Sequence, residues 1–295
     1  MAENNNPIID IHPDVKPDIY SHFQTISKER TSESIRPVPV LEAKNVVKRF
    51  GEHTVIPGLS FVIDDIVGKS EIVSLIGPSG CGKSTILNLI AGLLQPSSGE
   101  MFVSGKLVEG PGQDRGMVFQ KYSSFPFLSV LDNIAYPLIH IKHMNRKDAC
   151  EVAKYWVDKM YLTKAENKYP YELSGGMQQR VAIARTLCMD AKIVLMDEPF
   201  GALDRKIRWE MQDLMAEILF MQSEHEYTVI IVTHDIPEAV FLGDRIWVAF
   251  KGTIEIAENL ARPCEPARIA QGKKDFQEIV SYFNEKIDSL DIKDK

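Results

Sequence analysis

A strand, a turn and a helix in the first third of the chain restrict its fold more than any other feature. The apolar run 71–76 predicts a buried strand, and apolar side chains at helical spacing predict a helix over 83–94. A strand that leads through a glycine-rich turn into a helix is typical of α/β folds that bind a nucleotide. The turn is a complete phosphate-binding loop, made of Gly77, Pro78, Ser79, Gly80, Cys81, Gly82, Lys83, Ser84 and Thr85.

The chemistry of this loop predicts ATP and Mg²⁺ as its ligands. Successive backbone N–H groups around Gly80 would surround the β- and γ-phosphates, and the positive end of the following helix would face the same oxygens. Lys83 would neutralise charge, and the Ser84 hydroxyl would bind Mg²⁺. A chance glycine-rich turn is the alternative, and the strand before the loop and the helix after it argue against that reading.

Two adjacent acids follow a second apolar strand. Residues 193–196 are apolar, and Asp197 and Glu198 come next in the sequence. Ligands in α/β folds bind beyond the C-terminal ends of the strands, so both carboxylates are expected at the nucleotide site. We assign Asp197 to Mg²⁺ and Glu198 to the general base that polarises the attacking water. The apolar strand before them argues against an ordinary pair of solvated surface charges.

A second candidate anion site lies between these motifs. Ser174 is a candidate N-cap residue, and Gly175 and Gly176 follow it at the start of a predicted helix. A hydroxyl group and free N–H groups at a helix N-terminus can bind phosphate. Because the chain already contains a phosphate loop, this second site makes sense if it completes the ATP site of another copy. The sequence therefore predicts a dimer with two ATP molecules between its subunits.

With these motifs in this order, the chain resembles the nucleotide-binding subunits of ABC transporters over about residues 40–250. The resemblance implies an α/β fold of the P-loop NTPase, ABC ATPase type, with an antiparallel β-subdomain and an α-helical subdomain at about 122–172. It also implies that Gln120 contacts Mg²⁺ and water and acts as a hinge. His234 would contact the γ-phosphate and orient the water, with a capping or core histidine as the alternative.

Two further site residues follow from the resemblance alone. Asp204 matches the loop that crosses the dimer seam, and Phe50 matches the aromatic residue that stacks on adenine. A place in a small core at a sheet edge remains the alternative for Phe50. Residues 125–128, Phe-Pro-Phe-Leu, lie where this family docks the coupling helices of its permease subunits. A local helical core is the alternative for that segment.

Within the family, residues 114–120 and 234–242 are most similar to importers of the nitrate/sulfonate/taurine group. The resemblance implies an ATPase that energises import of a small anionic nutrient, with transmembrane permease subunits and, indirectly, a substrate-binding protein as partners. The alternatives are a soluble ABC-type ATPase that acts on DNA or ribosomes and an ABC exporter or lipid transport ATPase. Long heptad repeats or a second ATP site in the chain would favour the soluble types, and the sequence contains neither.

We divide the chain into an N-terminal extension (1–38), an ABC ATPase domain (39–255) and a C-terminal tail (256–295). The extension is rich in proline and polar residues and is expected to be flexible, with docking of its short apolar runs as the alternative. Runs at 40–50, 54–64 and 100–108 predict an antiparallel sheet, and 192–196, 206–221 and 228–232 predict strand, helix and strand. The tail contains an apolar stripe that predicts a helix packed on its own domain, made of Phe276, Ile279, Val280, Phe283, Ile287 and Leu290.

Charge and composition exclude some classes of function. The formal net charge of −7 argues against nucleic acid as a main partner. No stretch approaches the ~20 apolar residues of a membrane span, and the polar start does not match a signal peptide. We therefore expect a cytoplasmic protein held at the inner face of the cell membrane by a partner. The 4 cysteines lack metal-site spacing and are expected to be reduced, with Cys188 buried.

Overall fold

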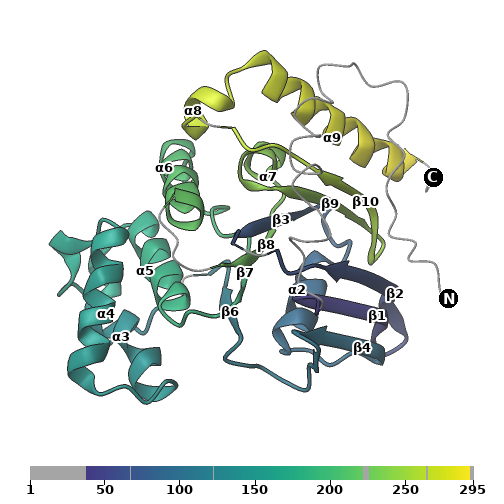
Figure 1. Cartoon of the computed structure of the whole chain (residues 1–295). Coiled ribbons are helices and arrows are strands. Elements are labelled where there is room, and N and C mark those ends of the chain that lie inside the picture. Colours follow the sequence, from purple (N-terminus) through teal and green to yellow (C-terminus); the bar gives the residue numbers. More distant parts are fainter. Residues whose placement is uncertain (1–37, 67, 122, 222–225, 264, 293–295) are drawn as a thin grey trace.

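The structure is a computed structural model, and it describes residues 38–66, 68–121, 123–221, 226–263 and 265–292. The expected N-terminal extension lies outside these residues apart from Val38, and so do its short apolar runs. Within the described ranges, the chain forms two β-sheets and a set of helices (Figure 1).

The first sheet is antiparallel, as the β-rich runs near the N-terminal end predicted. Its strands are arranged in the order β2-β1-β4-β5. All three pairings are antiparallel, and β-bulges interrupt the register between β1 and both of its neighbours. The strands are β1 (Leu41–Phe50), β2 (His53–Ile63), β4 (Ser98–Val103) and β5 (Lys106–Leu107).

The second sheet carries the strands that the nucleotide motifs predicted. Its order is β10-β9-β3-β8-β7-β6, and every neighbouring pair is parallel except β10 with β9. The parallel strands therefore all end at the same edge of the sheet. The strands are β3 (Glu71–Ile76), β6 (Arg115–Val118), β7 (Ile193–Asp197), β8 (Thr228–Val232), β9 (Arg245–Phe250) and β10 (Thr253–Asn259).

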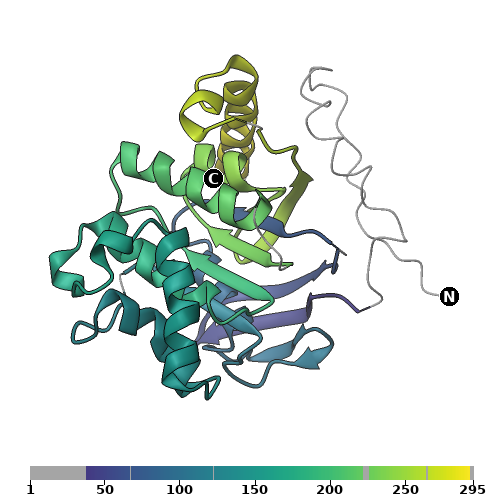
Figure 2. The ribbon, with the colours of Figure 1, turned by 60° about the vertical axis from the view of Figure 1, so that its left-hand side comes forward.

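Two groups of helices lie beside these sheets. In both views of the ribbon, α3 to α5 lie on one side, the antiparallel sheet lies on the other, and α8 and α9 lie above (Figures 1 and 2). Short 3₁₀ turns, η1 (Thr163–Ala165) and η2 (Pro170–Glu172), precede α5. The helices are α2 (Lys83–Ala91), α3 (Val130–His140), α4 (Arg146–Lys159), α5 (Gly175–Leu187), α6 (Arg205–Ala216), α7 (Ile236–Leu242), α8 (Ala267–Ala270) and α9 (Lys274–Ile292).

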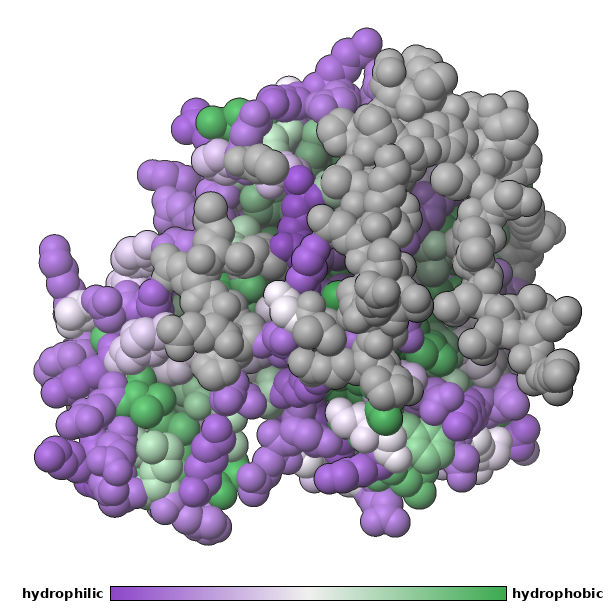
Figure 3. All heavy atoms as spheres, viewed as in Figure 1, coloured by the Kyte–Doolittle hydropathy of each residue, from purple (hydrophilic) through white to green (hydrophobic). Residues whose placement is uncertain are grey.

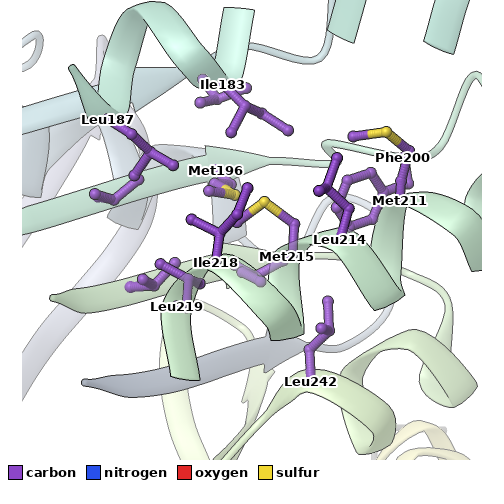
Figure 4. Close-up of a cluster of buried hydrophobic side chains, with 14 of the residues drawn as sticks. Ile183, Leu187, Met196, Phe200, Met211, Leu214, Met215, Ile218, Leu219 and Leu242 are labelled. Carbon is purple, nitrogen blue, oxygen red and sulfur yellow. The ribbon is translucent and has the colours of Figure 1, made fainter. Parts of the chain in front are cut away.

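The four inner strands of the six-stranded sheet, β9, β3, β8 and β7, are buried on both faces. Successive side chains of a strand point to opposite faces. Ile72 and Ile76 join the apolar cluster formed with helices α3 to α9, whereas Val73 and Leu75 join the cluster formed with α2 and the antiparallel sheet. This double burial explains why the strands are continuous apolar runs. Figure 4 shows part of the first cluster, where side chains of α5, β7 and α6 meet.

Two helices end differently from the prediction. The helix after the phosphate loop ends at Ala91 and not at residue 94, because Gly92 adopts a left-handed conformation (φ 75°) and caps it. Its backbone N–H donates to the carbonyl of Leu89 at 3.1 Å. The helix expected over 206–221 ends as α-helix at Ala216, and a π-helical turn, η3 (Glu217–Met221), continues it.

The C-terminal tail is part of the core, as its apolar stripe predicted. Phe283 is fully buried, Phe276 and Ile279 are nearly so, and Ile287 packs against the same cluster. Strand β10 spans 253–259 and completes the six-stranded sheet, so this sheet crosses the expected boundary between residues 255 and 256. Residues 253–259 pair with β9 in an antiparallel arrangement, with a register shift between Ile254 and Ile256.

Replacing Phe283 by alanine tests this packing. Its side chain is 0% exposed, so its loss leaves a cavity, and we expect the free energy of unfolding to fall by about 3–5 kcal/mol. Ile292→Ala is the matched control: that side chain ends the same helix, is 71% exposed, and should change stability by about 0.5 kcal/mol or less. Urea denaturation of both variants measures the difference. Equal, small effects would contradict the packing of α9 on the core.

The surface is largely hydrophilic on the face shown in Figure 3, with apolar side chains gathered over the α3–α5 region and over the antiparallel sheet. Among the described residues, none of the helices combines the length and the apolar content that a membrane span requires.

Candidate functional site

The predicted site residues come together at one edge of the six-stranded sheet. Gly77 follows β3, Asp197 ends β7, and His234 lies two residues beyond the end of β8. Gln120 lies two residues beyond the end of β6. Because β3, β8, β7 and β6 are adjacent and parallel, these four positions lie at the same edge. Ligands of α/β sheets bind at this edge.

The phosphate loop has the backbone geometry that an anion site requires. Gly80 and Gly82 have positive φ angles of 79° and 101°, which favour glycine. Gly82 is also the N-cap of α2 and provides no side-chain cap, so the first N–H groups of that helix face outward. Lys83 is nearly buried, and its Nζ donates to the carbonyls of Gly77 and Pro78 at 2.8 Å each. Its charge therefore lies inside the loop.

The hairpin between β9 and β10 packs against the phosphate loop. The backbone N–H of Gly252 donates to the carbonyl of Cys81 at 2.9 Å. A Cβ atom on Gly77 would lie 2.2 Å from the carbonyl oxygen of Ala249, so only glycine fits there. Cys81 itself is nearly buried, and burial raises the pKa of its thiol despite the nearby Lys83 charge.

A hydroxyl group and a carboxylate lie beside each other where Mg²⁺ is expected. The Ser84 hydroxyl donates to Oδ1 of Asp197 at 3.1 Å. Burial raises the pKa of Asp197, and the negative charge of Glu198 acts in the same direction. Magnesium binds oxygen ligands, and it commonly takes one or two protein carboxylates together with the phosphates of a substrate. The paired oxygens of Ser84 and Asp197 fit this pattern.

Glu198 lies between Gln120 and His234. Nε2 of Gln120 donates to Oε2 of Glu198 at 2.7 Å, and Nδ1 of His234 lies 3.3 Å from Oε1 of Glu198. Glu198 has a φ of 45°, which is uncommon for a residue with a Cβ atom. Strained backbone of this kind concentrates at functional sites. Three residues that the sequence placed after three different strands thus form one side-chain cluster.

Ser174 and Asp204 begin two helices that pack against each other. Ser174 is exposed and caps α5 by accepting a hydrogen bond from the N–H of Met177 at 3.4 Å, as predicted. A Cβ atom on Gly176 would lie 2.7 Å from Cγ2 of Ile207, so a glycine there allows α5 to approach α6. Asp204 caps α6 and accepts from the N–H of Ile207 at 3.0 Å. In the described ranges, no hydrogen bond joins either cap residue to the phosphate loop.

Side-chain exposure decides between the two interpretations of Phe50 and between those of the segment 125–128. Phe50 ends β1 with 47% of its surface exposed, which rules out a place in a small core. For 125–128, Phe125 matches the local helical core, because its ring packs on the Tyr136 ring of α3 at 4.6 Å. Phe127 is 70% exposed, as a docking segment requires. The segment is therefore anchored on one side and open on the other.

An ion pair that the sequence did not predict lies beside the site. Arg208 on α6 pairs with Asp235, the residue after His234. Arg208 also donates from Nη2 to the carbonyl of Leu203 at 3.3 Å, so it ties the loop before Asp204 to the segment that carries His234. The sequence places Arg208 on the helix that follows Asp204, so its position near the site could have been predicted. Its partner Asp235 follows a different strand, so the ion pair itself could not.

This arrangement of loop, hydroxyl group, acids and glutamine at the ends of parallel strands defines a P-loop nucleotide site. The ABC transporter family matches residues 63–201. The nitrate transport protein NasD of Klebsiella oxytoca is 37% identical over 262 residues, which cover 84% of this chain and 97% of that protein. The nitrate import ATP-binding protein NrtD of a Synechocystis species is 46% identical over 191 residues, 64% of this chain and 70% of that protein. The chain belongs to the ABC transporter family, as one of its ATP-binding proteins.

A solved structure supports the same fold and the enzyme class. A dimeric ATP-binding cassette in a post-hydrolysis state, bound to ADP and Pi, is 34% identical to this chain with a TM-score of 0.63. The alignment covers 75% of this chain and 98% of the solved one. The chain has the P-loop ABC ATPase fold, binds ATP and is an ATPase.

Proposed function

We propose that this protein is the ATP-hydrolysing subunit that energises an ABC importer of a small anion of the nitrate type. The names of the relatives support this: NasD is a nitrate transport protein, and NrtD is a nitrate import ATP-binding protein. The alternative of a soluble ATPase acting on DNA or ribosomes gains no support from them. The observation that carries the proposal is the Gln120–Glu198–His234 cluster beside a phosphate loop, in a relative of importer subunits.

The phosphate loop would bind the triphosphate, and side chains at the start of α2 and the end of β7 would bind the metal. The N–H groups from Gly80 to Lys83 and the N-terminus of α2 would bind the β- and γ-phosphates. Bound Mg²⁺ would neutralise charge that develops on these oxygens. The Ser84 hydroxyl and the Asp197 carboxylate, 3.1 Å apart, are its proposed ligands, and Gln120, which donates to the adjacent Glu198, is a third. Phe50, exposed at the end of β1, would stack on adenine.

Glu198 would act as the general base. As a water oxygen attacks the γ-phosphorus, Glu198 accepts a proton from that water, and ADP leaves with the bridging oxygen. Gln120 would hold the carboxylate through its 2.7 Å hydrogen bond, which aims the other oxygen at the water. His234, 3.3 Å from that other oxygen, would contact the γ-phosphate and orient the water.

The second phosphate contact would come from another copy of the chain. Ser174 is exposed at the N-terminus of α5, and its motif would complete the ATP site of the partner subunit, with Asp204 at the seam. The solved relative is itself dimeric and bound to ADP and Pi, which supports this assembly. ATP would close the dimer and hydrolysis would release it, so binding energy becomes motion.

The motion would be passed to permease subunits of the transporter, with a substrate-binding protein as an indirect partner. Phe127 is exposed on a segment whose neighbour Phe125 is fixed on α3, and the Arg185 side chain of α5 lies over the Phe125 ring at 5.3 Å. This segment follows Gln120 closely in the chain, so it is suited to couple the nucleotide site to a docked partner. The protein would then lie at the inner face of the membrane.

Uptake measurements test this proposal. We expect deletion of the gene from its source organism to abolish ATP-dependent uptake of one small anion, with nitrate, taurine and an alkanesulfonate assayed in parallel. A plasmid with the wild-type chain should restore that uptake, and Glu198→Gln should not, because it keeps the fold and lacks the base. Unchanged uptake of all three anions, together with loss of export of another compound, would overturn the importer assignment.

A further inference from the structure

Glu238 is a buried acid beside the segment that carries His234. It lies in the first turn of α7, and 2% of its surface is exposed. Its backbone N–H donates to Oδ1 of Asp235 at 2.9 Å. Among the described residues, its side-chain Oε1 has no hydrogen-bond partner. Burial of a carboxyl group in this state costs free energy, and none of the roles proposed above requires it.

The carboxyl group lies beside two different elements. It interacts with the side chain of Thr233, the residue before His234, and with that of Gln212 on α6, and both interactions favour its charged form. Thr233 is itself fixed, since its Oγ1 accepts from the N–H of Asp235 at 3.0 Å. Glu238 therefore connects the beginning of the His234 segment to α6.

The connection continues into the C-terminal tail. Oε1 of Gln212 accepts from Nε2 of Gln271 at 2.9 Å, and Oε1 of Gln271 accepts from Nε1 of Trp209 at 2.8 Å. Gln212 is 1% exposed, so this chain of side-chain amides is protected from water at its inner end. A second, parallel link is the Arg208–Asp235 ion pair described above. Both links join the His234 segment to the helix that begins after Asp204.

The surroundings of Glu238 favour its neutral form. Burial raises the pKa of Glu238 to about 8, and the negative charge of Asp235 adds to this rise, which the Arg208 charge and the bonds to Thr233 and Gln212 oppose. From β3, the ionisable residue is Glu71, which pairs with Arg245 at 3.0 Å. The buried side chains of α9 are apolar (Phe276, Ile279, Val280 and Phe283). When Glu238 ionises, the negative charge of Asp235 repels it.

We propose that Glu238 is a positioning residue for ATP hydrolysis: its carboxyl group holds the segment Thr233–Asp235, and with it His234, in register with α6. The inference rests on the proposed role of His234. Loss of the carboxyl contacts would let the His234 ring shift relative to Glu198, whose Oε1 lies 3.3 Å from Nδ1 of His234. A shift of about 1 Å at a reacting group can lower a rate by about 10²-fold.

Steady-state kinetics of two substitutions test this. Glu238→Leu removes the carboxyl group and its interactions with Thr233 and Gln212, and we expect kcat to fall by about tenfold or more while KM for ATP stays within about twofold. Glu238→Gln keeps the shape and neutral hydrogen-bonding groups, so it should recover most of the lost kcat. Glu258→Gln is the matched control: burial also raises the pKa of Glu258, but its partner is Tyr282 of α9, so its kcat should equal that of the wild type.

The pH profile separates positioning from general stability. The Glu238 carboxyl loses its proton as the pH rises through its raised pKa, which places a second negative charge beside Asp235. Wild-type kcat should therefore fall on the alkaline side more steeply than kcat of Glu238→Gln, which cannot ionise. If Glu238→Leu is insoluble, this comparison decides the question, and identical profiles for wild type and Glu238→Gln overturn the proposal.

A third variant distinguishes this inference from the proposed function. His234→Ala should lower kcat strongly if His234 orients the water. An unchanged kcat of His234→Ala would overturn the assigned role of His234 and the present inference with it. A low kcat for His234→Ala together with a wild-type kcat for Glu238→Leu would overturn the positioning role alone.

Discussion

Glu198→Gln is expected to bind ATP like the wild type and to hydrolyse it about 10²–10⁴-fold more slowly, the range that general-base catalysis contributes. The amide oxygen of the new residue can still accept the 2.7 Å hydrogen bond from Gln120, so the site should keep its shape. The amide cannot take a proton from water. Single-turnover hydrolysis of radiolabelled ATP measures the rate, and equilibrium binding of a fluorescent ATP analogue measures the affinity.

The same variant should accumulate as an ATP-bound dimer, because ATP that is not consumed keeps the two subunits together. Size-exclusion chromatography with and without MgATP measures the dimer fraction. Glu100→Gln, a substitution of the same type on the exposed part of β4, is the control and should hydrolyse ATP at the wild-type rate. Hydrolysis by Glu198→Gln at the rate of this control would show that another group activates the water.

A mixture of two defective chains is expected to form ATP-dependent dimers that neither chain forms alone. Lys83→Ala removes the charge that lies inside the phosphate loop. A hydrogen bond to a charged group contributes about 1.5–3 kcal/mol, so ATP affinity should fall by roughly tenfold to a hundredfold. Ser174→Arg places a bulky side chain at the exposed N-terminus of α5, which would block the phosphate contact to a partner.

The mixed dimer regains one complete site. The Ser174→Arg chain supplies an intact Lys83, and the Lys83→Ala chain supplies an intact Ser174 across the seam. Chains with different fluorescent labels report association by energy transfer as ATP is added. Absence of any ATP-dependent signal in the mixture would contradict a site completed in trans. Equal signals from the mixture and from Ser174→Arg alone would contradict it as well, because Ser174 would then be dispensable.

Strands were easier to predict than helix ends. The bounds of β3 and β8 agree with the predicted runs 71–76 and 228–232, because a strand buried on both faces is apolar from one end to the other. The helix after the phosphate loop stops early because Gly92 turns the chain, and a Cβ there would lie 2.1 Å from the carbonyl oxygen of Gly110. That contact depends on a residue beyond the helix, so periodicity alone could not reveal it.

The site residues were identifiable one by one, and their contacts were not. Gln120 carries no signal by itself, and its hydrogen-bond partner, Glu198, is 78 positions away. The structure joins the two because β6 and β7 are neighbours with parallel register, from Arg115 opposite Ile193 to Val118 opposite Met196. Glu238 lies within the segment 234–242, which is similar to importer subunits, but nothing in the sequence indicates that its carboxyl group is buried.

By itself, the sequence determined the chemistry that is available: a phosphate loop, a hydroxyl group and acids for a metal and water, and a second anion site without a partner in its own chain. These are local properties, because a glycine-rich turn or a helix cap is specified by neighbouring residues. Only the tertiary structure decided which groups act together. The order of parallel strands brings Gln120, Glu198 and His234 to one edge, and packing of α6 against α7 and the tail buries Glu238 among polar partners. Strand order and side-chain burial depend on contacts between residues far apart in the chain, and for this reason the single sequence leaves them open.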